Sequence, residues 1–353
     1  MSAPVSPVPE ITAEPLLTAR DLAVHFPVGS QLMARLRHRE QLLRAVDGVD
    51  LEVRRGEALA LVGESGSGKS TLALALAGLR PTDRGEIEFG GRALPARRSR
   101  DDRRAIQMVF QDPYSSLNPR LTVGGMLGEL LRVHHVAPRG EVRSYSAELL
   151  QLVGLDEDAL GAYPRQFSGG QRQRVAIARA LALRPEVLVA DEPVSALDVS
   201  VQATILNLLG DLRAELGLTL LLISHNLAVV RHLCDRVAVM YLGRIVEVAP
   251  TEQLFRDPRH PYTRGLLAAI PRLTDQVAEA GPPALTGDPP SPLNIPAGCR
   301  FRTRCPLAQP RCEQEDPALT AGQAGPAHLA ACHYAFTPVP APASAATASP
   351  EQA

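Results

Sequence analysis

Short apolar runs alternate with longer amphipathic segments along most of this chain, and the alternation predicts both strands and helices. The strand-like segments are residues 16–26, 44–53, 57–62, 186–190 and 218–224, and the helical patterns include residues 71–79, 171–183 and 201–216. The later strands are apolar throughout, as in buried parallel sheets. The pattern therefore predicts an α/β fold with a mostly parallel sheet.

Changes in amino-acid composition divide the chain into a large domain and a smaller one. We expect one α/β domain over residues 15–254, with a more polar helical insertion at about 112–165. A small C-terminal domain over residues 255–336 is richer in proline and glycine and carries four cysteines. The tails at residues 1–14 and 337–353 have the low complexity of disordered segments. A basic stretch at residues 31–44 predicts a solvated loop, with contact to anionic lipid or a partner as the alternative.

Charge and hydropathy exclude several classes of protein. The 353 residues include 37 basic and 38 acidic side chains, a net charge of -1, which gives no basic footprint for nucleic acid. No apolar run reaches the roughly 18 to 20 residues of a membrane-spanning helix. The N-terminus lacks the charged and apolar regions of a signal peptide, so we expect a cytosolic protein.

A glycine-rich loop joins the strand of residues 57–62 to the helix of residues 71–79 and fits the pattern G-x-x-x-x-G-K-[ST] in full. In this pattern, backbone N–H groups cradle phosphates, the lysine reaches the β- and γ-phosphates and the serine hydroxyl binds Mg²⁺. Lys69 is the only lysine among the 37 basic residues, which indicates a tight contact that arginine cannot replace. The predicted nucleotide-binding residues are Gly63, Glu64, Ser65, Gly66, Ser67, Gly68, Lys69, Ser70 and Thr71.

Two adjacent carboxylates end the apolar segment at residues 187–192. They would lie at the carboxyl edge of the sheet, where α/β proteins bind ligands. We expect Asp191 to hold Mg²⁺ together with Ser70, and Glu192 to accept a proton from attacking water. An acidic helix cap before Pro193 is the alternative, but it explains only one of the two carboxylates.

A serine and two glycines open the predicted helix at residues 171–183. This arrangement predicts a second phosphate-binding turn, made by Ser168, Gly169, Gly170 and Gln171. Since one nucleotide does not need two such turns, we expect this one to contact a nucleotide held by another subunit. An ordinary helix N-cap is the alternative.

The order of these motifs over residues 15–255 resembles the ATPase subunit of ABC transporters, with Phe167 in place of the usual leucine. The resemblance implies that Gln111 links Mg²⁺ and the attacking water to the transporter interface, and that His225 contacts the γ-phosphate. It implies that Phe26, or its neighbour His25, stacks on adenine. A D-loop across the dimer would be formed by Ser195, Ala196, Leu197 and Asp198.

Residues 45–49, 110–119, 260–263 and 290–306 resemble the ATP-binding subunits of oligopeptide and dipeptide importers. The resemblance implies an F-type subunit that hydrolyses ATP on the cytoplasmic face of the membrane. Its partners would be two permease subunits, a second, homologous ATPase subunit and, indirectly, an extracellular solute-binding protein. Nickel or an antimicrobial peptide as cargo remains an alternative, and a soluble non-transport ABC ATPase is a more distant one.

Four of the five cysteines, Cys299, Cys305, Cys312 and Cys332, lie close together in the C-terminal part of the chain. In a cytosolic chain this grouping predicts a metal site rather than disulfides. The spacing lacks the close pairs of zinc modules. The looser spacing of iron–sulfur ligands, together with the importer resemblance, favours a [4Fe–4S] cluster, with Zn²⁺ or free thiols as alternatives. Cys234, inside a helical segment of the large domain, is expected to be a packing residue.

Overall fold

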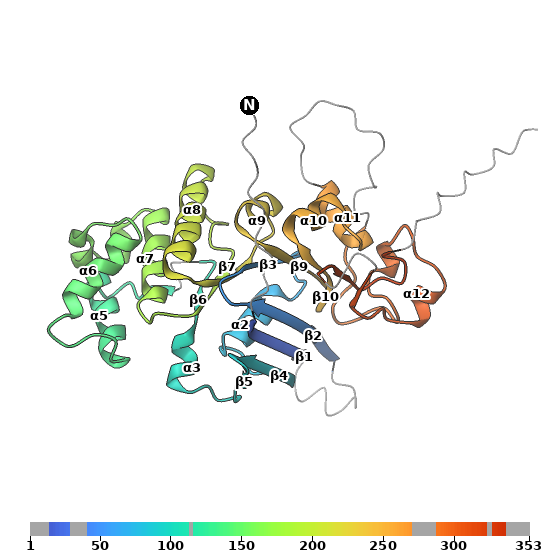
Figure 1. Ribbon diagram of the computed structural model, residues 1–353, viewed down its shortest axis with the longest axis horizontal. Helices are drawn as coiled ribbons and strands as arrows, with labels where there is room; N and C mark the ends of the chain where they lie inside the picture. The colour runs from blue at the N-terminus through green and yellow to red at the C-terminus, as the bar shows by residue number, and fades with distance from the viewer. Residues whose placement is uncertain (1–13, 29–40, 113–115, 270–286, 323–326, 337–353) are drawn as a thin grey trace, which may run out of the picture.

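The computed structural model describes residues 14–28, 41–112, 116–269, 287–322 and 327–336. The two predicted disordered tails lie outside these ranges except for residue 14, and so does most of the basic stretch at residues 31–44. Figure 1 shows a long central sheet with helices above it and a second sheet below.

Within the described ranges, the central sheet has eight strands in the order β11-β12-β10-β9-β3-β8-β7-β6. The neighbours β9, β3, β8, β7 and β6 run parallel, whereas β10, β12 and β11 add antiparallel pairs at one edge. The strands are β3 (Ala58–Val62), β6 (Ile106–Val109), β7 (Val187–Asp191), β8 (Thr219–Ile223), β9 (Arg236–Tyr241), β10 (Arg244–Pro250), β11 (Thr320–Ala321) and β12 (Leu329–Ala330). The predicted α/β fold with a mostly parallel sheet is confirmed.

The second sheet is antiparallel, in the order β2-β1-β4-β5. Its strands are β1 (Pro15–Val28), β2 (Gln41–Arg54), β4 (Arg84–Phe89) and β5 (Arg92–Ala93). Helix α2 (Lys69–Leu76) packs between the two sheets, and its Leu72 joins Leu17 of β1 and Leu221 of β8 in one buried cluster. The cluster fixes the start of α2 relative to the central sheet.

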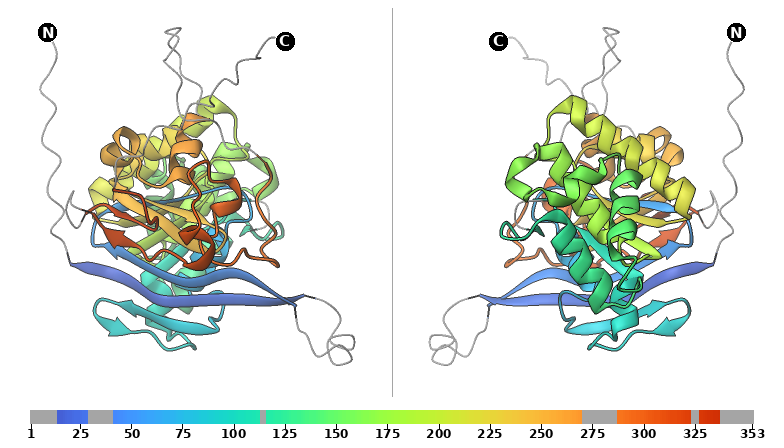
Figure 2. Two further views of the ribbon diagram at one scale, coloured as in Figure 1. Left: turned by 90° about the vertical axis from the view of Figure 1, so that its right-hand side faces the viewer. Right: turned by 90° about the vertical axis from the view of Figure 1, so that its left-hand side faces the viewer.

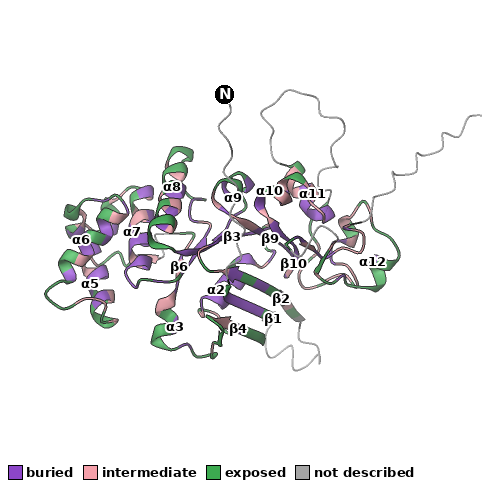
Figure 3. Ribbon diagram, in the orientation of Figure 1, coloured by how far each residue is buried: buried purple, intermediate pink, exposed green. Residues whose placement is uncertain are grey.

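Most of the remaining helices cover the other face of the central sheet and the end beyond β6, while short α12 (Arg311–Gln314) lies at the opposite end (Figures 1 and 2). Over the sheet lie α7 (Gly169–Leu181), α8 (Val199–Leu216), α9 (Leu227–Leu233), α10 (Thr251–Arg256) and α11 (Pro261–Ala268). Beyond β6 lie α5 (Val123–Val133) and α6 (Val142–Leu152), with the 3-10 turns η1 (Glu157–Gly161) and η2 (Pro164–Gln166) after them. Short α3 (Arg100–Ala105) leads into β6. The outward faces of α5 and α6 are exposed (Figure 3).

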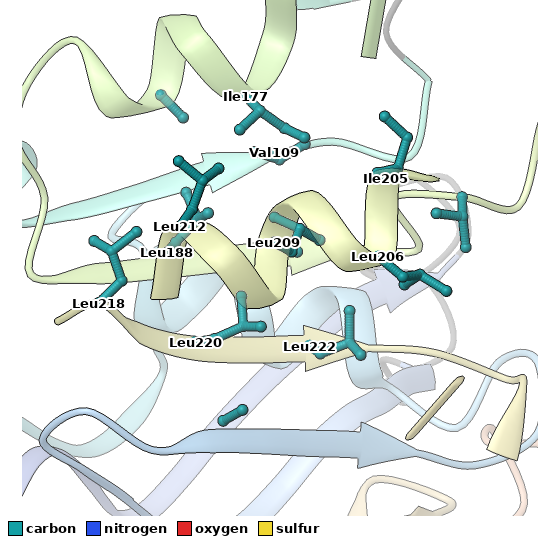
Figure 4. Close-up of a cluster of buried hydrophobic side chains, with 14 of the residues drawn as sticks. Val109, Ile177, Leu188, Ile205, Leu206, Leu209, Leu212, Leu218, Leu220 and Leu222 are labelled. Atoms are coloured by element: carbon teal, nitrogen blue, oxygen red, sulfur yellow. The ribbon is translucent and has the colours of Figure 1, made fainter. Parts of the chain in front are cut away.

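Side chains of the central strands alternate between two apolar clusters, as strand geometry requires. In β8, Leu220 and Leu222 face the cluster under α8, whereas Leu221 and Ile223 face α2 and the antiparallel sheet. Figure 4 shows Leu206, Leu209 and Leu212 of α8 lying over β8. Both faces of the sheet are therefore buried, which explains why its strands are apolar throughout.

The C-terminal residues continue the core of the large domain instead of forming a visibly distinct unit. Strand β12 pairs with β10, and Phe301 is 1% exposed within the main apolar cluster. Buried Glu247 of β10 accepts hydrogen bonds from the backbone of Arg259 and His260 and lies 2.7 Å from Nε2 of His328. A separate small domain is thus not shown. Cys234, predicted within a helix, is buried at the cap just after α9.

Replacing Glu247 with glutamine should destabilise the fold by roughly 2 to 4 kcal/mol, because buried donors would lose a charged acceptor. Burial raises the pKa of Glu247, but the hydrogen bonds with His328 and two backbone N–H groups favour the charged form, and the pKa is lowered overall. The carboxylate's contribution is therefore present above the unfolded pKa and lost as the pH falls through the folded pKa.

Urea unfolding of Glu247→Gln against the wild type checks this expectation. The matched control is Glu252→Gln, which breaks an exposed pair with Arg231 and should change stability by about 0.5 kcal/mol or less. Equal midpoints for both variants would contradict the role of Glu247.

Candidate functional site

A cavity of about 660 Å³ opens where α2 begins, at the carboxyl edge of the central strands. It is lined by thirteen residues from the glycine-rich loop, both sheets and the C-terminal region: Phe26, Leu43, Ala45, Ser65, Gly66, Gly68, Lys69, Ser70, Thr71, Gln111, Glu192, His225 and Pro292. The structure thus brings together most of the residues predicted to bind a nucleotide.

The loop before α2 has a backbone that only glycine accommodates at its two ends. Gly63 has φ 153°, and a Cβ there would lie 2.2 Å from the carbonyl oxygen of Met240. Gly68 has φ 106°, and a Cβ there would lie 2.0 Å from the carbonyl oxygen of Ala45. The loop therefore lies directly against the backbone of β9 and β2.

Lys69 is the first residue of α2, and its side chain folds back over the loop. Its Nζ donates to the carbonyl oxygens of Gly63 and Glu64, both at 2.8 Å. Burial lowers the pKa of Lys69, and the carboxylates of Glu192, Asp191 and Glu64 oppose that shift. The ammonium is held in the place where the sequence pattern expects it to meet phosphate.

Ser70 and Asp191 meet across the cavity floor. The Ser70 hydroxyl donates to Oδ1 of Asp191 at 3.1 Å, and Asp191 is the last residue of β7. Burial raises the pKa of Asp191, which means that its charged form lacks compensation from water. A hydroxyl and a carboxylate in this position are oxygen donors suited to Mg²⁺.

Glu192 lies between Gln111 and His225. Nε2 of Gln111 donates to one carboxylate oxygen at 3.0 Å, and Nδ1 of His225 lies 3.2 Å from the other. The backbone of Glu192 has φ 45°, an unusual conformation for a side chain of this size, and its N–H donates to Ile223. The carboxylate is thereby held toward the cavity by groups from two other loops.

The serine–glycine turn caps α7 and does not line this cavity. Ser168 accepts a bond from the N–H of Gln171 at 3.3 Å, and the side chain of Gln171 accepts one from the N–H of Ser168 at 3.0 Å. This is the N-cap that was the alternative interpretation, and the turn's position outside the cavity leaves it available to a second molecule. The glycines Gly169 and Gly170 pack closely against Leu197 and Val201, so the turn and the D-loop adjoin.

The D-loop residues predicted from the resemblance lie between β7 and α8. The side chain of Gln111 also reaches Oγ of Ser195, at 3.4 Å, which ties this loop to the cavity. Asp198 is the N-cap residue of α8, and Val199 after it is 82% exposed. Ala196 lies between Ser195 and Asp198 on the same loop.

Of the two aromatic candidates for adenine stacking, Phe26 lines the cavity and His25 is engaged elsewhere. Nε2 of His25 lies 3.2 Å from Oδ1 of Asp47. The guanidinium of Arg80 covers the Phe26 ring at 4.1 Å from its centroid. The geometry favours Phe26.

Three C-terminal residues near the cavity were given no role by the sequence. Pro292 lines the cavity, the Tyr262 hydroxyl accepts a bond from the N–H of Glu64, and Arg304 pairs with the Glu64 carboxylate. Their only signal was membership of segments that resemble the importer subunits, because nothing in their spacing predicts a contact with a loop some two hundred positions earlier.

The four clustered cysteines line one small pocket with His260, His333 and Tyr334. Burial raises the pKa of Cys299 to about 11 and that of Cys305 to about 12, and the neighbouring thiols add to the effect. None of the five cysteines, all within the described ranges, forms a disulfide. Among the described residues, no three cysteine, histidine, aspartate or glutamate side chains are placed to hold a single metal ion.

Across the part of the chain that the structure describes, no helix combines the length and apolarity needed to cross a bilayer.

Two family models match this chain. Residues 46–195 match the model described as ABC transporter, and residues 246–312 match the model described as oligopeptide/dipeptide transporter, C-terminal region. The second match includes β10, α11 and three of the clustered cysteines.

Curated proteins and solved structures agree with these models. A putative peptide import ATP-binding protein of Brucella ovis is 47% identical over 91% of this chain and 98% of its own length. The oligopeptide transport ATP-binding protein AppF of Bacillus subtilis is 45% identical over 91% of this chain and 97% of its own length. A dimeric ATP-binding cassette in a post-hydrolysis state, bound to ADP and Pi, is 29% identical with a TM-score of 0.58, over 67% of this chain and 98% of that one.

Replacing Lys69 with arginine should weaken nucleotide binding or turnover by about 100-fold or more, although the charge is kept. The broad guanidinium does not fit the buried position between the loop carbonyls and the carboxylates. Equilibrium binding of ATP and steady-state turnover measure the effect. Arg55→Lys, which exchanges the same residue types in an exposed ion pair with Glu186, should leave both unchanged. Near-normal activity of Lys69→Arg would show that the single lysine carries no meaning.

Proposed function

The chain belongs to the ATP-binding subunits of ABC transporters that import oligopeptides, and from that premise we propose a role for each residue around its nucleotide cavity. As a member of this family it is the ATPase subunit of a peptide importer. The observation that carries the assignment of roles is the carboxylate of Glu192, held by Gln111 and His225 beside the glycine-rich loop.

In the proposed site, the backbone N–H groups from Gly63 to Thr71 surround the β- and γ-phosphates, and Lys69 transfers its hydrogen bonds from the loop carbonyls to phosphate oxygens. Phe26 stacks on adenine. Ser70, Asp191 and Gln111 hold Mg²⁺, which would neutralise phosphate charge. The bond between Ser70 and Asp191 supports that fit, because both side chains offer oxygen ligands and burial raises the pKa of Asp191 despite the nearby charge of Lys69.

Glu192 acts as general base in this proposal. It accepts a proton from a water molecule as the water oxygen bonds to the γ-phosphorus and the bond to the β-phosphate oxygen breaks, releasing ADP and phosphate. His225 and Gln111 orient the carboxylate and the γ-phosphate. Their bonds to Glu192 support these positioning roles.

The second phosphate-binding turn completes the site of a partner subunit. Ser168, Gly169, Gly170 and Gln171 lie outside this chain's own cavity, and the adjoining D-loop of Ser195, Ala196, Leu197 and Asp198 runs along the same surface. We propose that two ATPase subunits enclose two ATP molecules between Lys69 of one chain and the turn of the other. That a related cassette is dimeric when bound to ADP and Pi supports the pairing of two such subunits.

The other partners follow from the importer family. Two permease subunits would receive the movement through the helices α5 and α6, and a solute-binding protein would deliver cargo outside the cell. We propose an F-type subunit on the cytoplasmic face of the membrane, paired with a second, homologous ATPase. Peptides are the proposed cargo, and nickel or an antimicrobial peptide would use the same mechanism.

We also propose that Cys299, Cys305, Cys312 and Cys332 bind one [4Fe–4S] cluster with a structural role. Four thiols around one buried pocket support it, since burial disfavours thiolates that have no cation beside them. The proposal rests on the shared pocket and on the sequence spacing, which lacks the close cysteine pairs of zinc modules.

Glu192→Gln should bind ATP within about threefold of the wild-type affinity but hydrolyse it roughly 100- to 10,000-fold more slowly, because only the base is lost. Turnover in the assembled importer and equilibrium binding of ATP separate the two effects. Glu215→Gln, an exposed change on α8, serves as the control and should behave as wild type. Wild-type turnover by Glu192→Gln would remove the residue from this role.

Anaerobically purified full-length protein should be brown and contain iron and sulfide, and Cys305→Ser should lose both. Cys234→Ser changes the buried cysteine outside the pocket and should keep the colour. Stoichiometric zinc without iron would replace the cluster by a zinc site. Neither metal, with four freely alkylated thiols, would exclude both.

A further inference from the structure

The C-terminal region contacts the glycine-rich loop, and the hydrogen bonds between them are made to one loop residue, Glu64. Nη1 and Nη2 of Arg304 donate to the two carboxylate oxygens of Glu64 at 2.8 and 3.0 Å. The Arg304 side chain is 5% exposed and that of Glu64 26% exposed. A two-pronged pair with this burial fixes orientation as well as distance, unlike a solvated surface pair.

Tyr262 holds the backbone of the same residue. Its hydroxyl accepts a hydrogen bond from the N–H of Glu64 at 2.8 Å. The ring is fully buried and packs against Tyr241, with centroids 4.6 Å apart, and against Phe301 at 5.5 Å. The hydroxyl therefore has a fixed position, and the loop must place its N–H there.

Lys69, inside the loop, is the third side chain that contacts Glu64, and its Nζ donates a hydrogen bond to the Glu64 carbonyl oxygen. The backbone of Glu64 is thus fixed between a phenol on one side and the phosphate-binding ammonium on the other, while its side chain is fixed by Arg304.

Arg304 is in turn anchored on the core. It ends the 3-10 turn η3 (Arg302–Arg304) directly after Phe301, which belongs to the main apolar cluster, and its guanidinium lies 6.0 Å from the ring centroid of Tyr241. Pro292, from the same C-terminal region, reaches the cavity wall. The contact of Arg304 with Glu64 is therefore supported by the packed core, and the same C-terminal region also lines the nucleotide cavity.

A glycine-rich loop loses much conformational freedom when its N–H groups converge on a phosphate. If the loop is ordered beforehand, that entropy is lost during folding and no longer opposes binding. We propose that Arg304 and Tyr262 are positioning residues that clamp the loop through Glu64 in the conformation that receives ATP. The clamp rests on ATP binding by this loop, which Lys69→Arg tests separately.

The test compares Arg304→Gln, Glu64→Gln and the double variant in the full-length protein, with ATP affinity measured by equilibrium binding and turnover measured in the assembled importer. Each single variant should raise the Kd and KM for ATP by about tenfold and change kcat by less than about threefold. The double variant should be no weaker than either single one, because both remove the same contact. Arg304→Lys keeps one hydrogen bond to the carboxylate, so its Kd for ATP should lie between those of the wild type and Arg304→Gln. Tyr262→Phe should raise the Kd for ATP a few-fold.

Arg311→Gln is the matched control, because Arg311 forms an exposed pair with Glu315 in the same region, away from the loop. It should bind ATP within twofold of the wild type. Wild-type Kd and KM in Arg304→Gln and Glu64→Gln, or losses that multiply in the double variant, would overturn the clamp. Should Arg304→Gln fail to fold, Glu64→Gln decides alone, since it leaves the packing of the C-terminal region unchanged.

Discussion

The parallel pairing of β3, β8 and β7 is the constraint on which the site depends. Parallel neighbours end at the same edge of the sheet, so the loops that follow them converge although they are far apart in sequence. The loop after β3 carries Lys69, the loop after β7 carries Glu192, and the loop after β8 carries His225. The two apolar clusters, one on each face of the sheet, fix these strands relative to one another. The strands in turn fix the positions of the functional side chains that follow them.

The C-terminal region depends on a different device, a buried charge. Glu247 lies on β10, between β9 and β12 of the same sheet, and binds His328 and the backbone of residues 259 and 260. A buried carboxylate satisfied by several donors specifies one arrangement, because any other leaves it unpaired. The aromatic packing of Tyr241, Tyr262 and Phe301 completes the attachment. The region that looks like a small appendage in the sequence is consequently an extension of the main core.

Local pattern was enough to predict β1, β2, β3, β7 and β8, the phosphate-binding loop and the paired carboxylates of Asp191 and Glu192, whereas the other described strands were not predicted. The predicted features are determined by residues close together in the sequence, so apolar runs and motif spacing are sufficient to predict them. A role for Gln111 came only from family resemblance, and its contact with Glu192, which spans 81 positions, was not predicted. The pair of Arg304 and Glu64 spans 240 positions, and no periodicity or spacing encodes it. The distinct C-terminal domain was predicted from a change in composition, which does not reveal whether two segments share a core.

Arg304 directly precedes Cys305, and Arg300, which pairs with Asp47, directly follows Cys299. Cys305 of the thiol pocket is therefore joined by a single peptide bond to Arg304, which contacts the phosphate loop at Glu64. Under the clamp, whatever tightens the thiol pocket also narrows the range of positions open to the Arg304 guanidinium. Linkage is reciprocal, so a ligand at the thiols that favours ATP must itself be held more firmly when ATP is bound. Under the two proposals, ligand binding at the thiols and ATP binding at the loop would each change the affinity of the other site.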